Sequence, residues 1–201
     1  MARQLLPVPQ PLAVFDQFIT PHPQTLVLKE GFMDSFDIKN VNGQPIFRVE
    51  GKILTAHGRK SFFDMQGNHL FDLIKELLHY HATFACETPG DKRKVLKVKS
   101  KFALLGSKAR ATFTNSRTGQ PVTLAMDGNW FDTTAEIKDA TTGVIVARID
   151  RKLMNMGEAF LGKQTYHLTI APGVDMTLIV AMAIALDEKN NEGQGGWCGV
   201  M

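Results

Sequence analysis

Short stretches in which apolar and polar residues alternate fill most of the chain. In residues 95–102, for example, Leu96 and Val98 alternate with Lys97 and Lys99. A period of two places successive side chains on opposite faces of a β-strand. The pattern predicts about twelve strands, at residues 24–29, 35–39, 45–51, 61–65, 68–73, 78–86, 95–102, 109–115, 121–126, 133–138, 143–149 and 164–170.

Turn signals separate these stretches, and some of them repeat. Asn42-Gly43 and Thr118-Gly119 each stand between two predicted strands, as tight hairpin turns require. Ile38-Lys39, four residues before a turn glycine, has a counterpart in Ile137-Lys138, which lies five residues before Gly143. Repeated hairpins favour an up-and-down barrel, although similar turn chemistry alone would give the same echo.

One long apolar stretch, residues 176–186, follows the last predicted strand and the breaker Ala171-Pro172-Gly173. Asp175 is a suitable N-cap for a helix there. Such a helix would be about 16 Å long, roughly half of a ~30 Å hydrocarbon core. It has no polar face, so it must be enclosed on every side. We therefore predict a mainly β fold, a closed antiparallel barrel of about twelve strands around a buried apolar C-terminal helix.

The domain organisation that follows is simple. Residues 1–22 are rich in proline, and we expect them to form an extended arm over the surface. Residues 23–190 form the barrel, with the central helix at about 175–188. Residues 191–201 contain several glycines and form a flexible tail.

Composition and charge fit one packed domain. Apolar residues make up 44% of the chain and charged residues 21%, and the net charge of +3 is too small for a dedicated nucleic-acid binder. Cys86 and Cys198 lie far apart, which fits a reducing compartment. Prolines interrupt the N-terminal residues where a secretory signal would be apolar. We expect a cytoplasmic protein without a transmembrane span or a nucleic-acid partner.

The helix and its flanks resemble a known family. Pro172-Gly173-Val174-Asp175 precedes the apolar stretch, and Leu186-Asp187-Glu188 ends it. Together with Phe47-x-Val49-x-Gly51 and Asp64-x-x-Gly67-x-x-Leu70, these motifs are similar to those of the LURP-one-related proteins. The resemblance covers roughly residues 20–190. The family often has a tryptophan where this chain has His79-Tyr80-His81.

The resemblance implies a twelve-stranded barrel shared with tubby C-terminal domains and phospholipid scramblases. It implies function more loosely. Tubby domains bind phosphoinositides, scramblases are associated with membrane lipid, and the plant members of the family are linked to defence. A shared fold by itself does not fix a function.

A run of basic residues is the most informative surface feature. Alternation places Lys97, Lys99 and Lys101 on one face of a strand. Such a face suits an anionic lipid headgroup, and the alternative is a solvated strand face whose lysines discourage edge pairing. The predicted lipid-binding residues are Lys92, Arg93, Lys94, Lys97, Lys99, Lys101, Lys108 and Arg110.

The last four residues, Cys198-Gly199-Val200-Met201, fit the C-a-a-X pattern, in which methionine favours a farnesyl group. The pattern predicts lipidation of Cys198. Because the match is short and Gly199 is an imperfect aliphatic position, an unmodified tail is the alternative. A single lipid anchors only weakly, so a second signal such as the basic face would be needed.

No catalytic residue, metal site or cofactor is predicted. The sequence lacks the G-x-S-x-G, H-E-x-x-H and P-loop motifs. His79 and His81 have no evident third ligand, and Cys86 is typical of a small core residue. We expect a non-enzymatic binder of anionic lipid or a membrane-peripheral adaptor. The alternatives are a small-molecule-binding or enzymatic accessory protein with a pocket at the barrel mouth, and a protein–protein scaffold in stress or defence.

Overall fold

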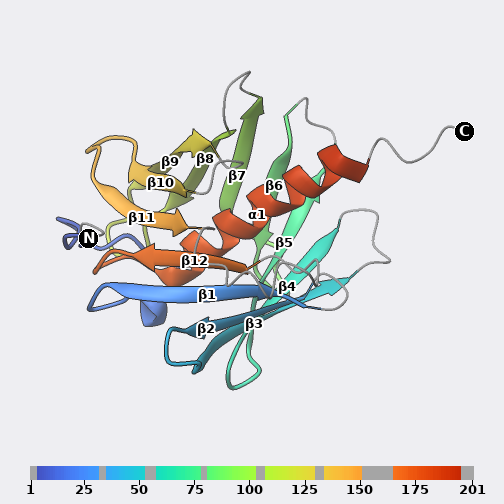
Figure 1. The fold of residues 1–201 in the computed structure, drawn as a ribbon, viewed down its shortest axis with the longest axis horizontal. Helices are drawn as coiled ribbons and strands as arrows, with labels where there is room; N and C mark the ends of the chain where they lie inside the picture. Colours follow the sequence, from blue (N-terminus) through green and yellow to red (C-terminus); the bar gives the residue numbers. More distant parts are fainter. Residues whose placement is uncertain are drawn as a thin grey trace, which may run out of the picture.

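Twelve antiparallel strands, counted within the residues that the computed structural model describes, close into one barrel (Figure 1). The described residues are 4–31, 35–52, 58–77, 81–102, 107–129, 134–150 and 165–195. The strands are β1 (Gln24–Glu30), β2 (Phe36–Asn40), β3 (Pro45–Lys52), β4 (Arg59–Asp64), β5 (His69–Glu76), β6 (Thr83–Glu87), β7 (Lys94–Phe102), β8 (Ser107–Thr114), β9 (Pro121–Asn129), β10 (Thr134–Asp139), β11 (Ile145–Asp150) and β12 (Thr165–Ile170).

Each strand pairs with its neighbours along the chain, and β1 also pairs with β12, which closes the barrel. Alternation then divides the side chains between two faces. On β1, for instance, Leu26 and Leu28 face the interior and are fully buried. The predicted fold class is confirmed. Closure also removes the exposed strand edges that an open sheet of this size would present.

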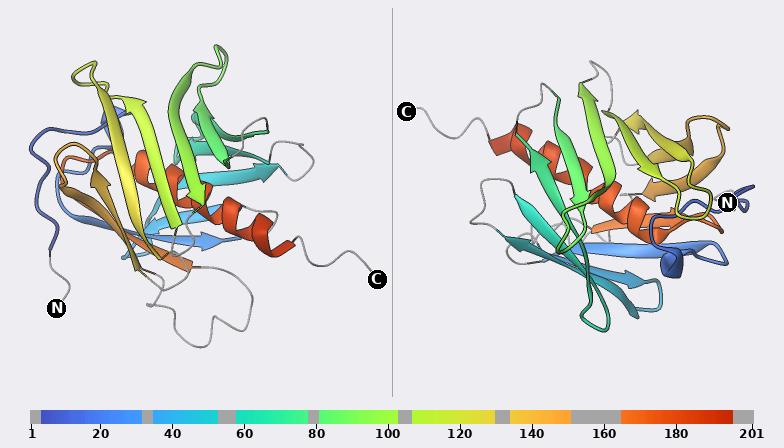
Figure 2. Two further views of the ribbon diagram at one scale, coloured as in Figure 1. Left: turned by 90° about the horizontal axis from the view of Figure 1, so that it is seen from above. Right: turned by 180° about the vertical axis from the view of Figure 1, so that it is seen from behind.

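The apolar helix α1 (Met176–Gly195) runs through the barrel (Figure 2). Every side chain from Leu178 to Leu186 is at most 2% exposed, as a helix without a polar face requires. Burying each large aliphatic side chain contributes about 1.5–3 kcal/mol. The helix approaches β7 and β12 most closely. Small inward residues on β7 and β8, namely Ser100, Ala109 and Ala111, leave room for it.

The helix extends further than the sequence predicts. Its expected end near residue 188 rested on the change from apolar to polar residues, but the structure continues it to Gly195. The first polar residues still lie inside the barrel. The Tyr166 hydroxyl donates a hydrogen bond to Asp187, and the Lys60 ammonium lies 2.9 Å from a Glu188 oxygen. Residues 191–195, expected to be tail, are therefore helical.

The N-terminal arm crosses one end of the barrel and packs into it. Leu5, Leu12 and Ala13 are buried, and a short 3-10 helix, η1 (Asp16–Phe18), follows them. The arm is more than the extended surface segment that the sequence predicts, because its apolar residues cover the barrel opening. We call this end the arm end, and the opposite end, where α1 leaves the barrel, the exit end.

The start of α1 holds the arm. The Asp175 carboxylate accepts a hydrogen bond from the Thr177 amide at 2.8 Å, which confirms the predicted N-cap. Its second oxygen accepts hydrogen bonds from the amides of Val14 and Phe15 at 3.0 and 2.8 Å. Burial raises the pKa of Asp175, although these hydrogen bonds oppose the shift. One buried side chain therefore caps the helix and anchors the arm.

The sequence similarity between the β2–β3 and β10–β11 hairpins corresponds to a shared structural feature. The β2–β3 pair shifts its register between Ile38 and Lys39, and the β10–β11 pair shifts between Ile137 and Lys138. In both hairpins an arginine, Arg48 or Arg148, lies opposite an acidic residue one position before the bulge. The same sequence pattern thus gives the same bulged hairpin twice.

Candidate functional site

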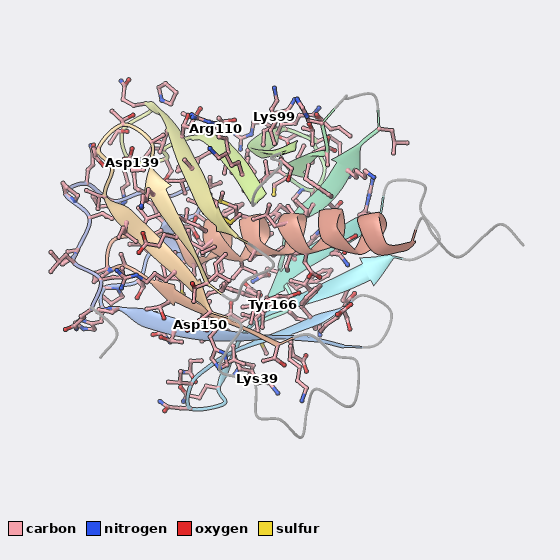
Figure 3. All side chains as sticks on the ribbon, turned by 45° about the horizontal axis from the view of Figure 1, so that its top comes forward. Lys39, Lys99, Arg110, Asp139, Asp150 and Tyr166 are labelled. Atoms are coloured by element: carbon pink, nitrogen blue, oxygen red, sulfur yellow. The ribbon has the colours of Figure 1, made fainter. Side chains whose placement is uncertain are left out.

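The predicted lipid-binding residues lie on β7, β8 and the turn before β7. Leu96 and Val98 of β7 point into the barrel, so Lys97 and Lys99 point outward. Lys99 stands opposite Arg110 of β8, and Figure 3 shows both on the same side of the barrel wall. Together the eight residues form what we call the basic surface.

Half of the basic surface, on the side of the β6–β7 turn, pairs with acidic side chains. We call Lys92, Arg93, Lys94 and Lys97 the turn-side group. The Lys94 ammonium donates a hydrogen bond to a Glu76 oxygen at 2.6 Å, and the Lys97 ammonium lies 2.9 Å from the other oxygen. Burial disfavours ionisation of Glu76, but the hydrogen bonds and charges of the two lysines outweigh it and lower its pKa to about 2. Glu76 therefore stays charged and neutralises part of this group.

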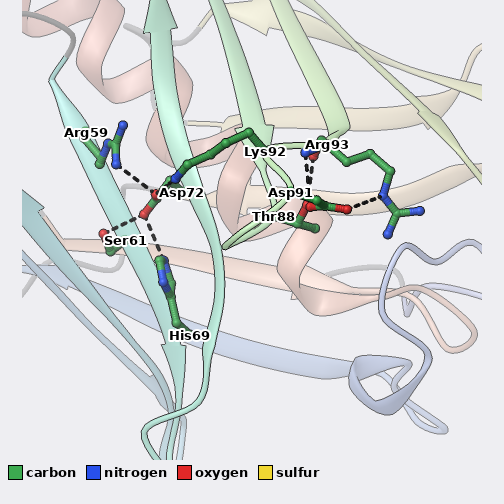
Figure 4. Close-up of polar contacts among 8 residues, drawn as sticks. All are labelled: Arg59, Ser61, His69, Asp72, Thr88, Asp91, Lys92 and Arg93. Carbon is green, nitrogen blue, oxygen red and sulfur yellow. Dashed lines mark hydrogen bonds and ion pairs between the residues drawn. The ribbon is translucent and has the colours of Figure 1, made fainter.

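Lys92 reaches a second acidic residue (Figure 4). Its backbone has a positive φ of 54°, the only such angle at a described non-glycine residue, and it occupies the turn between β6 and β7. Its ammonium lies 3.8 Å from a carboxylate oxygen of Asp72. The next residue, Arg93, pairs with Asp91 at 3.7 Å. Both cations therefore have an acidic partner.

Asp72 is a carboxylate buried in the outer wall of the barrel. One oxygen accepts a hydrogen bond from the Ser61 hydroxyl at 2.7 Å and lies 2.9 Å from the His69 ring. The other oxygen lies 3.3 Å from the Arg59 guanidinium. Sequence reasoning missed this cluster, because only the register of β4 and β5 and the turn before β7 bring its members together.

The order of groups in the Asp72 cluster does not match nucleophilic catalysis. A serine nucleophile needs a histidine between it and the carboxylate to take its proton. Here Ser61 and His69 both bind the same oxygen of Asp72, so the carboxylate stands in the middle. The arrangement balances the charge of a buried carboxylate and provides no activated nucleophile.

The rest of the basic surface lies towards the exit end. We call Lys99, Lys108 and Arg110 the exit-side group. Within the described part of the chain, no ion pair joins any of them to an acidic residue. Lys101 stands opposite Lys108 in the strand register, and its side chain lies outside the described residues. Cationic side chains are thus side by side on two neighbouring strands.

Two hollows lie towards the arm end. A groove of about 670 Å³ lies between the arm and the outer wall of β7–β9. Its lining is partly apolar, with Phe15 and Val122, and partly polar, with Arg93, Lys97 and Thr123. A smaller hollow of about 250 Å³ lies among the turns at the arm end.

Of the cysteines and histidines considered in the sequence, Cys86 and His81 lie among the described residues. Cys86 is buried in the core, and burial raises the pKa of its thiol, which suits a packing role. His81 lies at a bend before β6, outside a strand. His79 and Cys198 lie outside the described residues. Among the described residues, no three histidine, cysteine or acidic side chains are grouped so as to hold a metal.

The fold and the surface define a helix-centred antiparallel β-barrel with a basic outer wall. The chain belongs to the LURP-one-related family, whose sequence profile matches residues 24–187. It is 23% identical over 196 residues to protein LURP-one-related 15 of Arabidopsis thaliana, an alignment that covers 92% of this chain and 90% of that protein.

Two further comparisons agree. Protein LURP-one-related 10 of Arabidopsis thaliana is 21% identical, with 89% of this chain and 96% of that protein covered. An Arabidopsis thaliana protein solved by X-ray crystallography superposes with a TM-score of 0.63 at 18% identity, over 88% of this chain and 97% of that one. At this identity the likeness supports the barrel fold alone. Across the described residues, no helix combines the length and hydropathy needed to span a bilayer.

Proposed function

We propose that this chain is a non-enzymatic protein that binds anionic lipid through the basic surface and associates peripherally with the cytoplasmic side of membranes. The observation that carries the proposal is the exit-side group, three outward cations without an acidic partner among the described residues. Near an anionic leaflet each basic residue contributes about 1 kcal/mol of attraction. We therefore expect several basic residues on one face to give measurable binding to such a membrane.

Liposome flotation tests the proposal. The purified protein is mixed with vesicles of phosphatidylcholine alone, with added phosphatidylserine, or with added phosphoinositide. We expect flotation only with the anionic vesicles, and less of it as salt rises, because salt screens exposed charges. Charge reversal at Lys97, Lys99 and Lys101 to glutamate should abolish flotation. Unchanged binding by that variant would remove the site assignment, and no binding of the wild type to either anionic vesicle would remove the function.

The groove beside the arm favours a second candidate function, the binding of a small polar molecule. Its cations and threonine hydroxyls can hydrogen-bond an anionic, hydroxyl-bearing ligand, and its volume of about 670 Å³ is within the range of ligand sites. Titration with inositol phosphates, observed by calorimetry, tests this without a membrane. If neither vesicles nor soluble ligands bind, the protein–protein scaffold becomes the favoured alternative.

A further inference from the structure

The basic surface is divided by charge balance. Each turn-side cation has an acidic partner, whether Asp72, Asp91 or Glu76. The exit-side cations have none among the described residues. An ion that is already paired attracts a distant surface less than an unpaired one, because the field of its partner cancels much of its own. The two groups should therefore contribute unequally to binding.

The exit-side group also lies at one end of the molecule. The β8–β9 turn meets the arm, since the Ser116 amide donates a hydrogen bond to the Ala13 carbonyl. The opposite ends of β7 and β8 therefore lie at the exit end. Lys108 is the second residue of β8, so it lies beside that end, and Lys99 and Arg110 follow directly behind it.

An exposed apolar side chain accompanies these cations. Leu77 is 52% exposed and directly follows β5, which runs in the same direction as β7 and also ends at the exit end. Ala82, just before β6, is joined to β7, because the Ser100 amide donates a hydrogen bond to the Ala82 carbonyl. The exit-side halves of β6, β7 and β8 contain no acidic residue. In the register, Asp127 of β9 stands opposite Lys108, and Glu76 of β5, which pairs with Lys94 and Lys97, lies across β6 from Lys99.

We infer that the exit end of the barrel is the surface that meets the bilayer, with Lys99, Lys108 and Arg110 against anionic headgroups and Leu77 at the interface. This inference rests on the proposed function and adds the orientation of the protein. Cations beside an exposed apolar side chain match a bilayer, which offers negative charge above hydrocarbon. Lys92 and Arg93, in the turn between β6 and β7, then stand away from the lipid.

A matched pair of double variants tests the division of the surface. Lys99→Gln with Arg110→Gln removes one lysine and one arginine from the exit side, and Lys92→Gln with Arg93→Gln removes the same two residue types from the turn side. Both proteins have the same net charge. On phosphatidylcholine vesicles containing phosphatidylserine, we expect the exit-side variant to bind roughly 30-fold more weakly than the wild type. The turn-side variant should stay within about threefold of the wild type, because its cations are already paired.

The outcomes separate this inference from the proposed function. If the wild-type protein does not bind anionic vesicles, both the proposed function and this inference are wrong. Wild-type protein that binds, while both variants lose equal affinity or the turn-side variant loses more, overturns the inference and leaves lipid binding in place. Thermal unfolding of both variants shows that each remains folded before binding is measured.

The orientation has its own readout. An environment-sensitive fluorophore is attached at Leu77→Cys or, as the control, at Met65→Cys, which is also exposed but lies in the β4–β5 turn at the arm end. Both carry Cys198→Ser, and Cys86 is too deeply buried to react. We expect the emission to shift to the blue on vesicles only for the label at 77. A shift at 65 alone, or at neither position on vesicles that bind, overturns the orientation.

Discussion

Glu76 shows how one residue changes the character of a surface. Its carboxylate bridges Lys94 and Lys97, and the two lysines keep its pKa near 2, against an ordinary value of 4.5. The Lys94 pKa is raised in return by its hydrogen bond to Glu76. A face that reads as uniformly basic is therefore partly neutral. The charge available to a partner is set by such pairings as well as by the number of lysines.

The low pKa of Glu76 predicts a dependence of stability on acid. The folded protein binds this proton less tightly than the unfolded chain, so the stabilisation is complete above pH 4.5 and is lost as the pH falls towards 2. After discounting for the exposure of Lys94, we expect the bridge to contribute about 1–2 kcal/mol. In thermal unfolding, Glu76→Gln should be less stable than the wild type near neutral pH, and the difference should shrink through that acidic range. A constant difference would contradict the bridge.

The sequence could not have predicted this pairing. The lysines were visible from the period of two, which places Lys97 and Lys99 on one face. Glu76 precedes them by about twenty residues and reaches them across β6, through the registers of β5 with β6 and of β6 with β7. The Asp72 cluster was missed for the same reason. Alternation gives the face of a side chain, but its cross-strand neighbour depends on the register.

At the scale of the elements, local sequence patterns predicted more of the structure than they did at the scale of single contacts. Alternation and turn glycines placed twelve strands close to those observed, and the apolar stretch placed the helix. The helix was predicted to end near residue 188, where the apolar stretch becomes polar, but the structure continues it to Gly195. Tyr166 and Lys60 provide partners inside the barrel for the first polar residues, Asp187 and Glu188. The arm was underestimated, since scattered apolar residues among prolines show no periodicity.

The attachment of the arm to α1 gives a prediction about these two elements. Asp175→Asn keeps one oxygen that can cap the helix at Thr177, but its amide nitrogen cannot accept hydrogen bonds from the amides of Val14 and Phe15. Two amides then lack their partner, at about 1–3 kcal/mol each while they stay buried. We expect the arm to detach and become sensitive to protease, while the circular dichroism of the barrel is kept.

A glycine variant tests the same attachment without changing the charge. Gly173 has a φ of +88°, and a β-carbon there would lie 2.7 Å from the Val8 side chain of the arm. Gly173→Ala should therefore also loosen the arm, without any change of charge. Protease cleavage of the arm that is no faster in either variant would show that the arm is held by its apolar residues alone.

At the scale of the whole molecule, the barrel and the helix depend on each other. Twelve strands leave an interior too wide to be filled by the strand side chains alone, and the helix has no side that tolerates water. Large aromatic residues fill the space along β2 to β5, where Phe62 stacks on Phe71 with ring centres 4.3 Å apart. Small residues on β7 and β8 admit the helix. The fit is asymmetric and should tolerate little change of volume.

This tight fit predicts how the core responds to added volume. Ala181 is fully buried on α1, and Ala181→Leu adds three carbon atoms to a space bounded by a closed sheet. Because a closed barrel can expand only by straining its hydrogen bonds, we expect a loss of about 1–3 kcal/mol in the free energy of unfolding, measured with urea. Ile184→Leu changes shape at constant volume and should cost less than about 1.5 kcal/mol. If Ala181→Leu proved as stable as the wild type, there would be unfilled space beside the helix, and the barrel interior would be less tightly packed than the burial of its side chains indicates.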